Sequence, residues 1–273
     1  MEAKLIRFFV YFFTVITFGS LLYVIGFIFL NGVVALKPEM FAWNYTTDNV
    51  SMMPAIITTF MVIFFALIIA APIGVFTAFF LIEYADSGNR FVKIIRTATD
   101  TLSAIPSIVY GLFGMLFFVV FLGFQYSLLA GILTSVIMVL PVIIRSTEEA
   151  LLSVNISLRE GSFALGAGKL RTIFKVVLPI AMPGILSGVI LAVGRIIGET
   201  AALMYTLGTS TSLPTSPFQS GRTLALHMYV LSSEGLHVRE SYATGVVLII
   251  LVLIVNSLST WLSNRLTKGE KQK

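Results

Sequence analysis

The longest stretch of this sequence without a charged residue runs from residue 101 to residue 144. A helix needs about 20 apolar residues to cross the roughly 30 Å hydrocarbon layer of a bilayer, so this stretch is long enough for two crossings. Of the 273 residues, 57% are hydrophobic and only 11% are charged, whereas soluble domains have about 25% charged residues. We therefore expect an all-α membrane protein, because helices satisfy their own backbone hydrogen bonds in lipid.

Six apolar segments can be placed along the chain, and together they predict one polytopic transmembrane domain over residues 1–273. The charge-free stretch divides at a turn from Gly123 to Tyr126. The first segment is too long for a signal peptide and has no cleavage site after it, so it is expected to stay. The fifth segment alone contains charges. The predicted spans are about residues 8–30, 54–82, 104–122, 127–144, 183–207 and 241–264.

The distribution of basic residues predicts the orientation, because cytoplasmic loops carry an excess of Lys and Arg. With the N-terminus inside, all but four of the 18 basic residues lie in cytoplasmic segments, the exceptions being Lys37, Arg195, Arg222 and Arg239. Both termini are therefore predicted to be cytoplasmic. The basic residues lie near membrane ends and form no patch interleaved with aromatic residues, which argues against nucleic-acid binding.

The longest cytoplasmic loop, residues 145–180, is strongly charged and has a helical pattern. We expect a short helix from Leu158 to about Leu165, broken at Gly166 and Gly168, and a second amphipathic stretch from Leu170 to Val177 that stops at Pro179. Small and apolar residues on the first helix suit insertion into a groove of another protein. A connector lying on the lipid headgroups remains the alternative.

This loop resembles the loop shared by permease subunits of ABC importers, which has the pattern E-A-A, three residues, G, nine residues, I, any residue, L-P. The matching positions here are Glu160, Gly161, Ser162, Gly166, Val176, Leu178 and Pro179. Small residues replace the two alanines, and Val replaces Ile. The resemblance implies a type I ABC importer permease fold. It also implies that Glu160, Gly161, Gly166, Leu178 and Pro179 belong to a coupling element that docks on separate ATPase subunits.

The sequence contains no P-loop of its own. The candidate glycine–lysine pair at 168–169 has Phe163 where the first glycine should be, and Leu170 where Ser or Thr is required. Cysteine is absent, and His227 and His237 have no carboxylate at ligand spacing, so no metal site is predicted. We therefore expect a subunit that is not an enzyme and holds no cofactor, with ATP and Mg²⁺ bound by partner subunits.

Arg195 and Glu199 lie near the middle of the fifth predicted span. A charge at this depth costs about 2.5–3.5 kcal/mol, so it needs a partner or a wet cavity. Four residues apart on a helix, the two side chains are expected to share one face. They can form an ion pair that fixes the bundle, or they can line a translocation path. Because Arg before Glu is the less favourable order within a helix, Arg195 is freer for a ligand such as a tetrahedral oxyanion.

Arg145, at the end of the fourth span, reads from the sequence alone as an arginine whose side chain snorkels to the interface. Four further segments, however, resemble the PstA family of phosphate-importer permeases, and the sister PstC family has similar motifs. These segments are residues 103–113, 140–149, 194–202 and 223–228. The resemblance implies that Arg145, Arg195 and Glu199 line a phosphate path.

The same resemblance implies a set of partners in a prokaryotic plasma (inner) membrane. These are membrane lipid, a homologous PstC-like permease, two PstB-like ATPase subunits and an extracytoplasmic PstS-like phosphate-binding protein. Two alternatives remain open. The chain can serve an ABC importer for another substrate, such as molybdate or an amino acid, or it can be a proton-coupled carrier that uses Arg195 and Glu199 as a relay.

Overall fold

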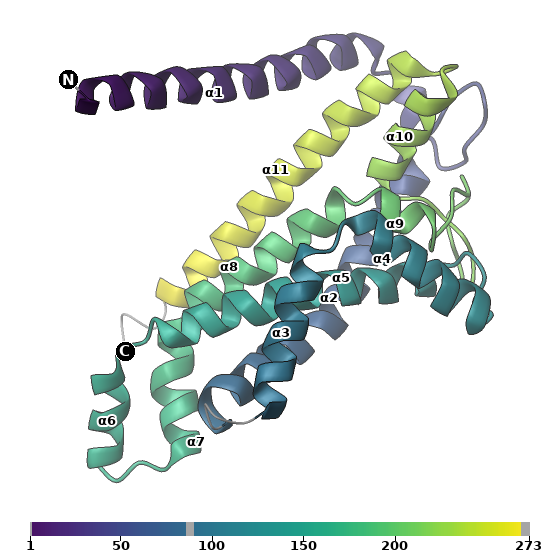
Figure 1. The fold of residues 1–273 in the computed structure, drawn as a ribbon. Coiled ribbons are helices and arrows are strands. Elements are labelled where there is room, and N and C mark those ends of the chain that lie inside the picture. Colours follow the sequence, from purple (N-terminus) through teal and green to yellow (C-terminus); the bar gives the residue numbers. More distant parts are fainter. Residues whose placement is uncertain (1, 86–89, 269–273) are drawn as a thin grey trace.

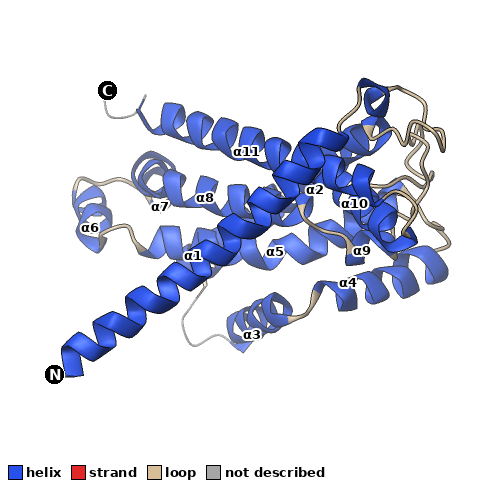
Figure 2. Ribbon diagram, turned by 90° about the horizontal axis from the view of Figure 1, so that it is seen from above, coloured by secondary structure: helices blue, strands red, loops and turns tan. Residues whose placement is uncertain are grey.

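The computed structural model describes residues 2–85 and 90–268, and two of the basic residues counted above, Lys271 and Lys273, lie outside these ranges. Throughout the described ranges the structure consists of helices and loops. Most long helices run side by side, with the irregular loops at one end and α6 and α7 at the other (Figures 1 and 2). The helices are α1 (Glu2–Ala35), η1 (Pro38–Phe41), α2 (Met53–Phe79), η2 (Phe80–Tyr84), α3 (Arg90–Ala104), α4 (Ser107–Gly114), η3 (Met115–Phe121), α5 (Leu128–Leu152), α6 (Ile156–Ala164), α7 (Lys169–Thr172), η4 (Ile173–Val177), α8 (Leu178–Ile197), α9 (Ala201–Met204), α10 (Leu224–Glu234) and α11 (Val238–Lys268).

Five of the described helical segments are long and apolar enough to cross a membrane. A sixth crossing is available if α3 and the α4–η3 helix form one broken span, bent by 106°. The bend lies at Pro106, because a proline disfavours helical geometry in the residue before it. The helix expected at 104–122 therefore begins at Ser107, and the charged residues before it form a helix of their own.

The core of the bundle is formed by α2, α5 and α8, which pack along most of their lengths. Small residues let α5 and α8 approach closely: a side chain at Gly188 would clash with Ser146, and one at Gly184 would clash with Ala150. These two contacts show that the helices are antiparallel, and they fix which residues lie at the same level. The buried residues of the core include Val139 and Ile143 of α5 and Ala192 and Ile196 of α8.

Helix α1 stands apart from the other helices over most of its length (Figure 1). Its side chains are almost all apolar and exposed, as expected of a helix whose solvent is lipid or another membrane protein. Only its last turns pack on α11, where Gly32 lies against the backbone of Tyr242. The ring of Phe27 also lies edge-on to the ring of Tyr242, at 5.7 Å between centroids.

Two expectations about the fifth span are wrong. The helix that starts at Lys169 does not stop at Pro179 but continues to Ile197. The π-helical turn η4 comes immediately before α8, so the hydrogen-bond pattern shifts there and the missing N–H of Pro179 does not end the helix. It also does not reach residue 207. It ends at Ile197, with Gly198 as its C-cap, and a separate short helix, α9, follows.

Candidate functional site

Arg195 lies in the last turn of α8 and is half-buried. Within the described part of the chain it forms no ion pair and no hydrogen bond. Tyr110 of α4 lies close enough to interact with it electrostatically. Tyr110 is 4% exposed, and its hydroxyl donates a hydrogen bond of 2.6 Å to the carbonyl of Leu102. A guanidinium beside a fixed aromatic ring and without a carboxylate partner retains all its donors for an incoming anion.

Glu199 does not share a helical face with Arg195, so that expectation is wrong. The residue follows the end of α8, and its carboxylate accepts a hydrogen bond of 2.9 Å from the backbone N–H of Ala202 at the start of α9. Glu199 is 7% exposed. A buried carboxylate at a helix start is stabilised by the free N–H groups there, which gives Glu199 a role that does not need Arg195.

Arg145 lies on α5 among acidic side chains. It forms ion pairs with Asp100 of α3 at 3.3 Å and with Glu149, one turn further along α5, at 3.5 Å. Beside them, Arg96 of α3 pairs with Glu148 of α5 at 3.3 Å. Three carboxylates thus face two guanidiniums here, and the local field disfavours a bound anion as long as these pairs are closed.

The packing of α5 against α8 gives the relative heights of the two arginines. Ser146 lies level with Gly188, and the helices are antiparallel. Arg195 is seven residues beyond Gly188, and Arg145 is one residue from Ser146 in the same direction. At a rise of 1.5 Å per residue, the two arginines are about 9 Å apart along the bundle.

The bend between α3 and α4 lies beside both arginines, since Asp100 precedes it and Tyr110 follows it. Neither residue was predicted to belong to the path. The sequence did contain a signal for Asp100, because it is the last charge before the long apolar stretch 101–144. Its partner is 45 residues away, however, so the pairing itself has no local signature.

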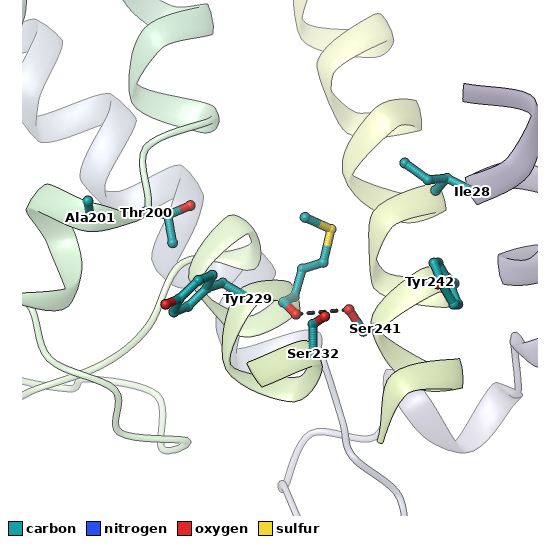
Figure 3. Close-up of a pocket in the computed structure, with 8 residues that line it drawn as sticks. Ile28, Thr200, Ala201, Tyr229, Ser232, Ser241 and Tyr242 are labelled. Atoms are coloured by element: carbon teal, nitrogen blue, oxygen red, sulfur yellow. Dashed lines mark hydrogen bonds between the residues drawn. The ribbon is translucent and has the colours of Figure 1, made fainter. Parts of the chain in front are cut away.

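The residues that follow Glu199 line a pocket of about 410 Å³ between α1, α9, α10 and α11. Figure 3 shows Thr200 and Ala201 on one side of this pocket and Ile28 and Tyr242 on the other, with the Ser241 hydroxyl donating a hydrogen bond of 2.9 Å to the carbonyl of Met228. None of the lining residues is charged. The pocket therefore offers an oxyanion no countercharge and is not a substitute for the arginines.

The loop between α5 and α8 folds locally in a way that explains Gly166. Helix α6 starts at an Asn155 cap, whose side chain accepts from the backbone N–H of Ser157 at 3.0 Å. The helix ends in a Schellman motif: Gly166 has φ +81°, its N–H bonds to Phe163, and the N–H of Ala167 bonds to Ser162. The predicted break at Gly166 is confirmed.

The exposed side of α6 carries the residues predicted to dock on an ATPase. Glu160 and Gly161 are exposed on α6, and Leu165, at its end, is 91% exposed. The last two residues of the pattern, Leu178 and Pro179, lie in the first turn of α8 and are half-buried. The pattern therefore combines an exposed tip with the start of a membrane helix.

Arg159 anchors α6 to the membrane helices. It forms an ion pair with Glu83 in η2, which extends α2, and donates a hydrogen bond of 2.8 Å to the carbonyl of Leu151 at the end of α5. Nearby, the Lys169 ammonium lies 4.7 Å from the centre of the Tyr84 ring. Arg159 thus connects α6 to α2 and α5, and the continuous α7–α8 helix leads from the same loop to Arg195.

The chain belongs to the family of binding-protein-dependent transport system inner membrane components, which it matches over residues 70–269. It is therefore a non-catalytic, multi-pass membrane subunit of an ABC importer, which works with ATPase and substrate-binding partners. Its relatives include the probable ABC transporter permease protein YqgI of Bacillus subtilis, 35% identical over 266 residues (89% of this chain and 88% of YqgI). The phosphate transport system permease protein PstA of Mycobacterium leprae is 39% identical over 194 residues (70% and 63%). These matches confirm the predicted PstA-like relationship.

Solved structures show the same fold. A chain of a bacterial alginate ABC transporter aligns with a TM-score of 0.72 at 15% identity, covering 98% of this chain and 96% of that one. A chain of the MetNI methionine transporter in an inward-facing conformation aligns with a TM-score of 0.61 at 23% identity, covering 78% and 93%. The predicted all-α type I importer permease fold is confirmed. In the described ranges no group of three His, Cys, Asp or Glu side chains is placed to hold a metal ion.

Proposed function

We propose that this chain is a permease subunit of an ATP-driven importer for inorganic phosphate. The observation that carries the proposal is Arg195: a half-buried arginine at the break between α8 and α9, without a carboxylate partner in the described structure. A guanidinium with free donors binds a tetrahedral oxyanion well. The similarity to phosphate permeases named PstA supports phosphate over other oxyanions.

The two arginines have different roles in this proposal. Phosphate first contacts Arg195, whose guanidinium has no carboxylate partner in the described structure. It then passes toward Arg145, about 9 Å further along the bundle. Arg145 receives it only when Asp100, its carboxylate partner on the neighbouring helix α3, moves away. Glu199 is a positioning residue, because its hydrogen bond to the backbone of Ala202 fixes the chain break next to Arg195.

Coupling to ATP uses the loop between α5 and α8. Glu160, Gly161 and Gly166 contact an ATPase subunit, while Leu178 and Pro179 connect the loop to the membrane helix that carries Arg195. ATP and Mg²⁺ are bound by two PstB-like subunits on the cytoplasmic side, where both termini lie. A homologous PstC-like permease completes the path, and a PstS-like binding protein delivers phosphate from outside.

The test is transport by the purified assembly in proteoliposomes, with ATP inside and the binding protein outside. We expect uptake of radiolabelled phosphate that requires the ATPase subunits and that excess molybdate or an amino acid does not inhibit. Uptake of molybdate or an amino acid in preference to phosphate would contradict the assigned substrate. Uptake that persists without the ATPase subunits would contradict the assigned mechanism and favour an ion-coupled carrier.

A further inference from the structure

The ion pair between Arg145 and Asp100 connects α3 to α5. Helix α3 also buries Val92 and Thr99, packs Ile95 and Leu102 against the core, and forms the second ion pair, Arg96 to Glu148. Residues of α3, among them Lys93, Thr97 and Thr101, line an open groove of about 850 Å³. Directly after α3 the chain bends by 106° into α4.

A substrate anion and the Asp100 carboxylate need the same donors. The Arg145 Nη1 atom donates to the Asp100 Oδ1 atom, and the Nε atom faces Glu149. These are the edges of the guanidinium that bind an oxyanion with two parallel hydrogen bonds. Arg145 and Asp100 are both more than half exposed, with side-chain exposures of 57% and 66%, so their pair is weak and an anion can displace the carboxylate.

Of the two carboxylates, Asp100 is the one whose distance from Arg145 depends on a movement between helices. Glu149 lies one turn from Arg145 on the same helix and stays within reach whatever α3 does. A pivot of α3 away from α5 breaks the contact with Asp100 and exposes the guanidinium. Closure of α3 returns the carboxylate and expels the anion.

Resting on the proposed function, we infer that Asp100 is a displaceable counter-ion of Arg145, which competes with the substrate oxyanion and promotes its release from the path. Asp100 thus sets how tightly the permease holds phosphate between entry and exit. Its role is to compete with the substrate for Arg145 rather than only to link α3 to α5, as the neighbouring pair of Arg96 and Glu148 does.

Two neighbouring carboxylates provide matched controls. Glu148→Gln removes the other ion pair between α3 and α5, which has the same length of 3.3 Å, and leaves Arg145 untouched. Glu149→Gln removes a carboxylate from Arg145 without loosening α3. Asp100→Glu keeps the charge on α3 and tests whether the carboxylate itself is required.

The experiment measures radiolabelled phosphate bound to the assembled transporter without its binding protein, and the maximal rate of ATP-driven uptake with it. For Asp100→Asn we expect phosphate binding about two- to fivefold tighter, because a weak competing pair is lost, together with a lower maximal uptake, because release is slower. Asp100→Glu should restore both values. Glu148→Gln should change the binding constant less than Asp100→Asn does, because Glu148 does not contact Arg145.

An Asp100→Asn variant that binds phosphate no more tightly than Glu148→Gln would show that Asp100 is only a tether and would overturn the inference. Tighter binding in Glu149→Gln but not in Asp100→Asn would also overturn it, since the competitor would then be intrahelical. The assigned substrate fails separately, if the wild-type assembly binds no phosphate at all or if Arg195→Gln binds it normally.

Discussion

The Glu199 carboxylate accepts its hydrogen bond from the backbone N–H of Ala202, at 2.9 Å, and leaves Arg195 without an acidic partner in the described structure. The two residues are four apart in sequence, but Arg195 lies in α8 whereas Glu199 lies in the break between α8 and α9, because α8 ends at Ile197. This arrangement separates two functions that an ion pair would have combined. Glu199 stabilises the chain break, and Arg195 remains free to bind an anion.

The hydrogen bond from Ala202 predicts that Glu199 needs an acceptor oxygen rather than a negative charge. Glu199→Gln keeps that oxygen, so the stability of the purified permease pair should change little. Glu199→Ala should lower the free energy of unfolding by about 0.5–2 kcal/mol, the usual cost of losing a helix cap. Thermal unfolding of the Glu199→Gln and Glu199→Ala variants measures this difference in stability. Equal destabilisation by both would mean that the charge, and hence an ion pair, is what matters.

Arg159 is predicted to hold the coupling loop to the membrane domain. Its side chain and that of Glu83 are 18% and 9% exposed, so Arg159→Ala leaves a largely buried carboxylate unpaired. We expect a loss on the order of 3 kcal/mol in the stability of the permease pair, measured without ATPase subunits. Arg171→Ala, at an exposed position on α7, is the control and should be neutral. Replacing both partners, Arg159→Met with Glu83→Leu, should recover most of the loss.

Gly166 and Gly161 provide a matched pair in the coupling loop, since a side chain would have open space at both positions. Gly166 has φ +81°, so Gly166→Ala forces an L-residue into a left-handed conformation at a cost of about 1–2 kcal/mol and misdirects α6. Gly161 lies inside α6, where alanine favours the helix. Co-purification of the ATPase subunits should fall with Gly166→Ala and be retained with Gly161→Ala. The reverse order would contradict the assigned geometry.

His227 of α10 is predicted to make the loop-rich end of the protein sensitive to acid. Burial, and secondly the positive charge of Arg222, lower the pKa of His227 to about 3, from an ordinary value near 6.5. The unfolded chain therefore binds a proton that the folded chain rejects between these values. The stability contributed by neutral His227 is complete above about pH 6.5 and decreases as the pH falls toward 3.

Thermal unfolding at pH 7.5 and pH 5.0 tests this pH dependence. The wild-type protein should lose more stability on acidification than His227→Phe, which has no titrating group. His237→Phe should behave like the wild type, because His237 is partly exposed. If His227→Phe and the wild-type protein lose the same stability, the acid sensitivity has another source.

The features that the sequence predicted are those encoded by neighbouring residues. Apolar runs predicted the membrane helices, and the requirement for glycine at a left-handed cap predicted the end of α6 at Gly166. The end of α8 was missed, because the apolar run continues through Leu207 and masks the local signal. That signal was present: Gly198 is a C-cap residue, and Glu199 lies three residues before Ala202, at capping distance.

Contacts between distant residues had no signature in a single sequence. Arg159 and Glu83 are 76 residues apart, and neither stands in a context that marks it as half of an ion pair. The same holds for Arg145, whose charge was noticed while the carboxylate on α3 that neutralises it was not. The sequence therefore singled out Arg145 and Arg195 as candidates, but it did not indicate which of them has a carboxylate partner in the described structure.

The central claim is that Arg195 contacts the transported anion. ATP-driven phosphate uptake by proteoliposomes should be compared for wild type, Arg195→Gln and Arg195→Lys, at equal amounts of assembled complex and with ATPase activity measured in parallel. We predict at least a tenfold loss of uptake for Arg195→Gln and partial recovery for Arg195→Lys, which restores the charge but not the planar donor group. Uptake by Arg195→Gln at the wild-type rate would contradict the account.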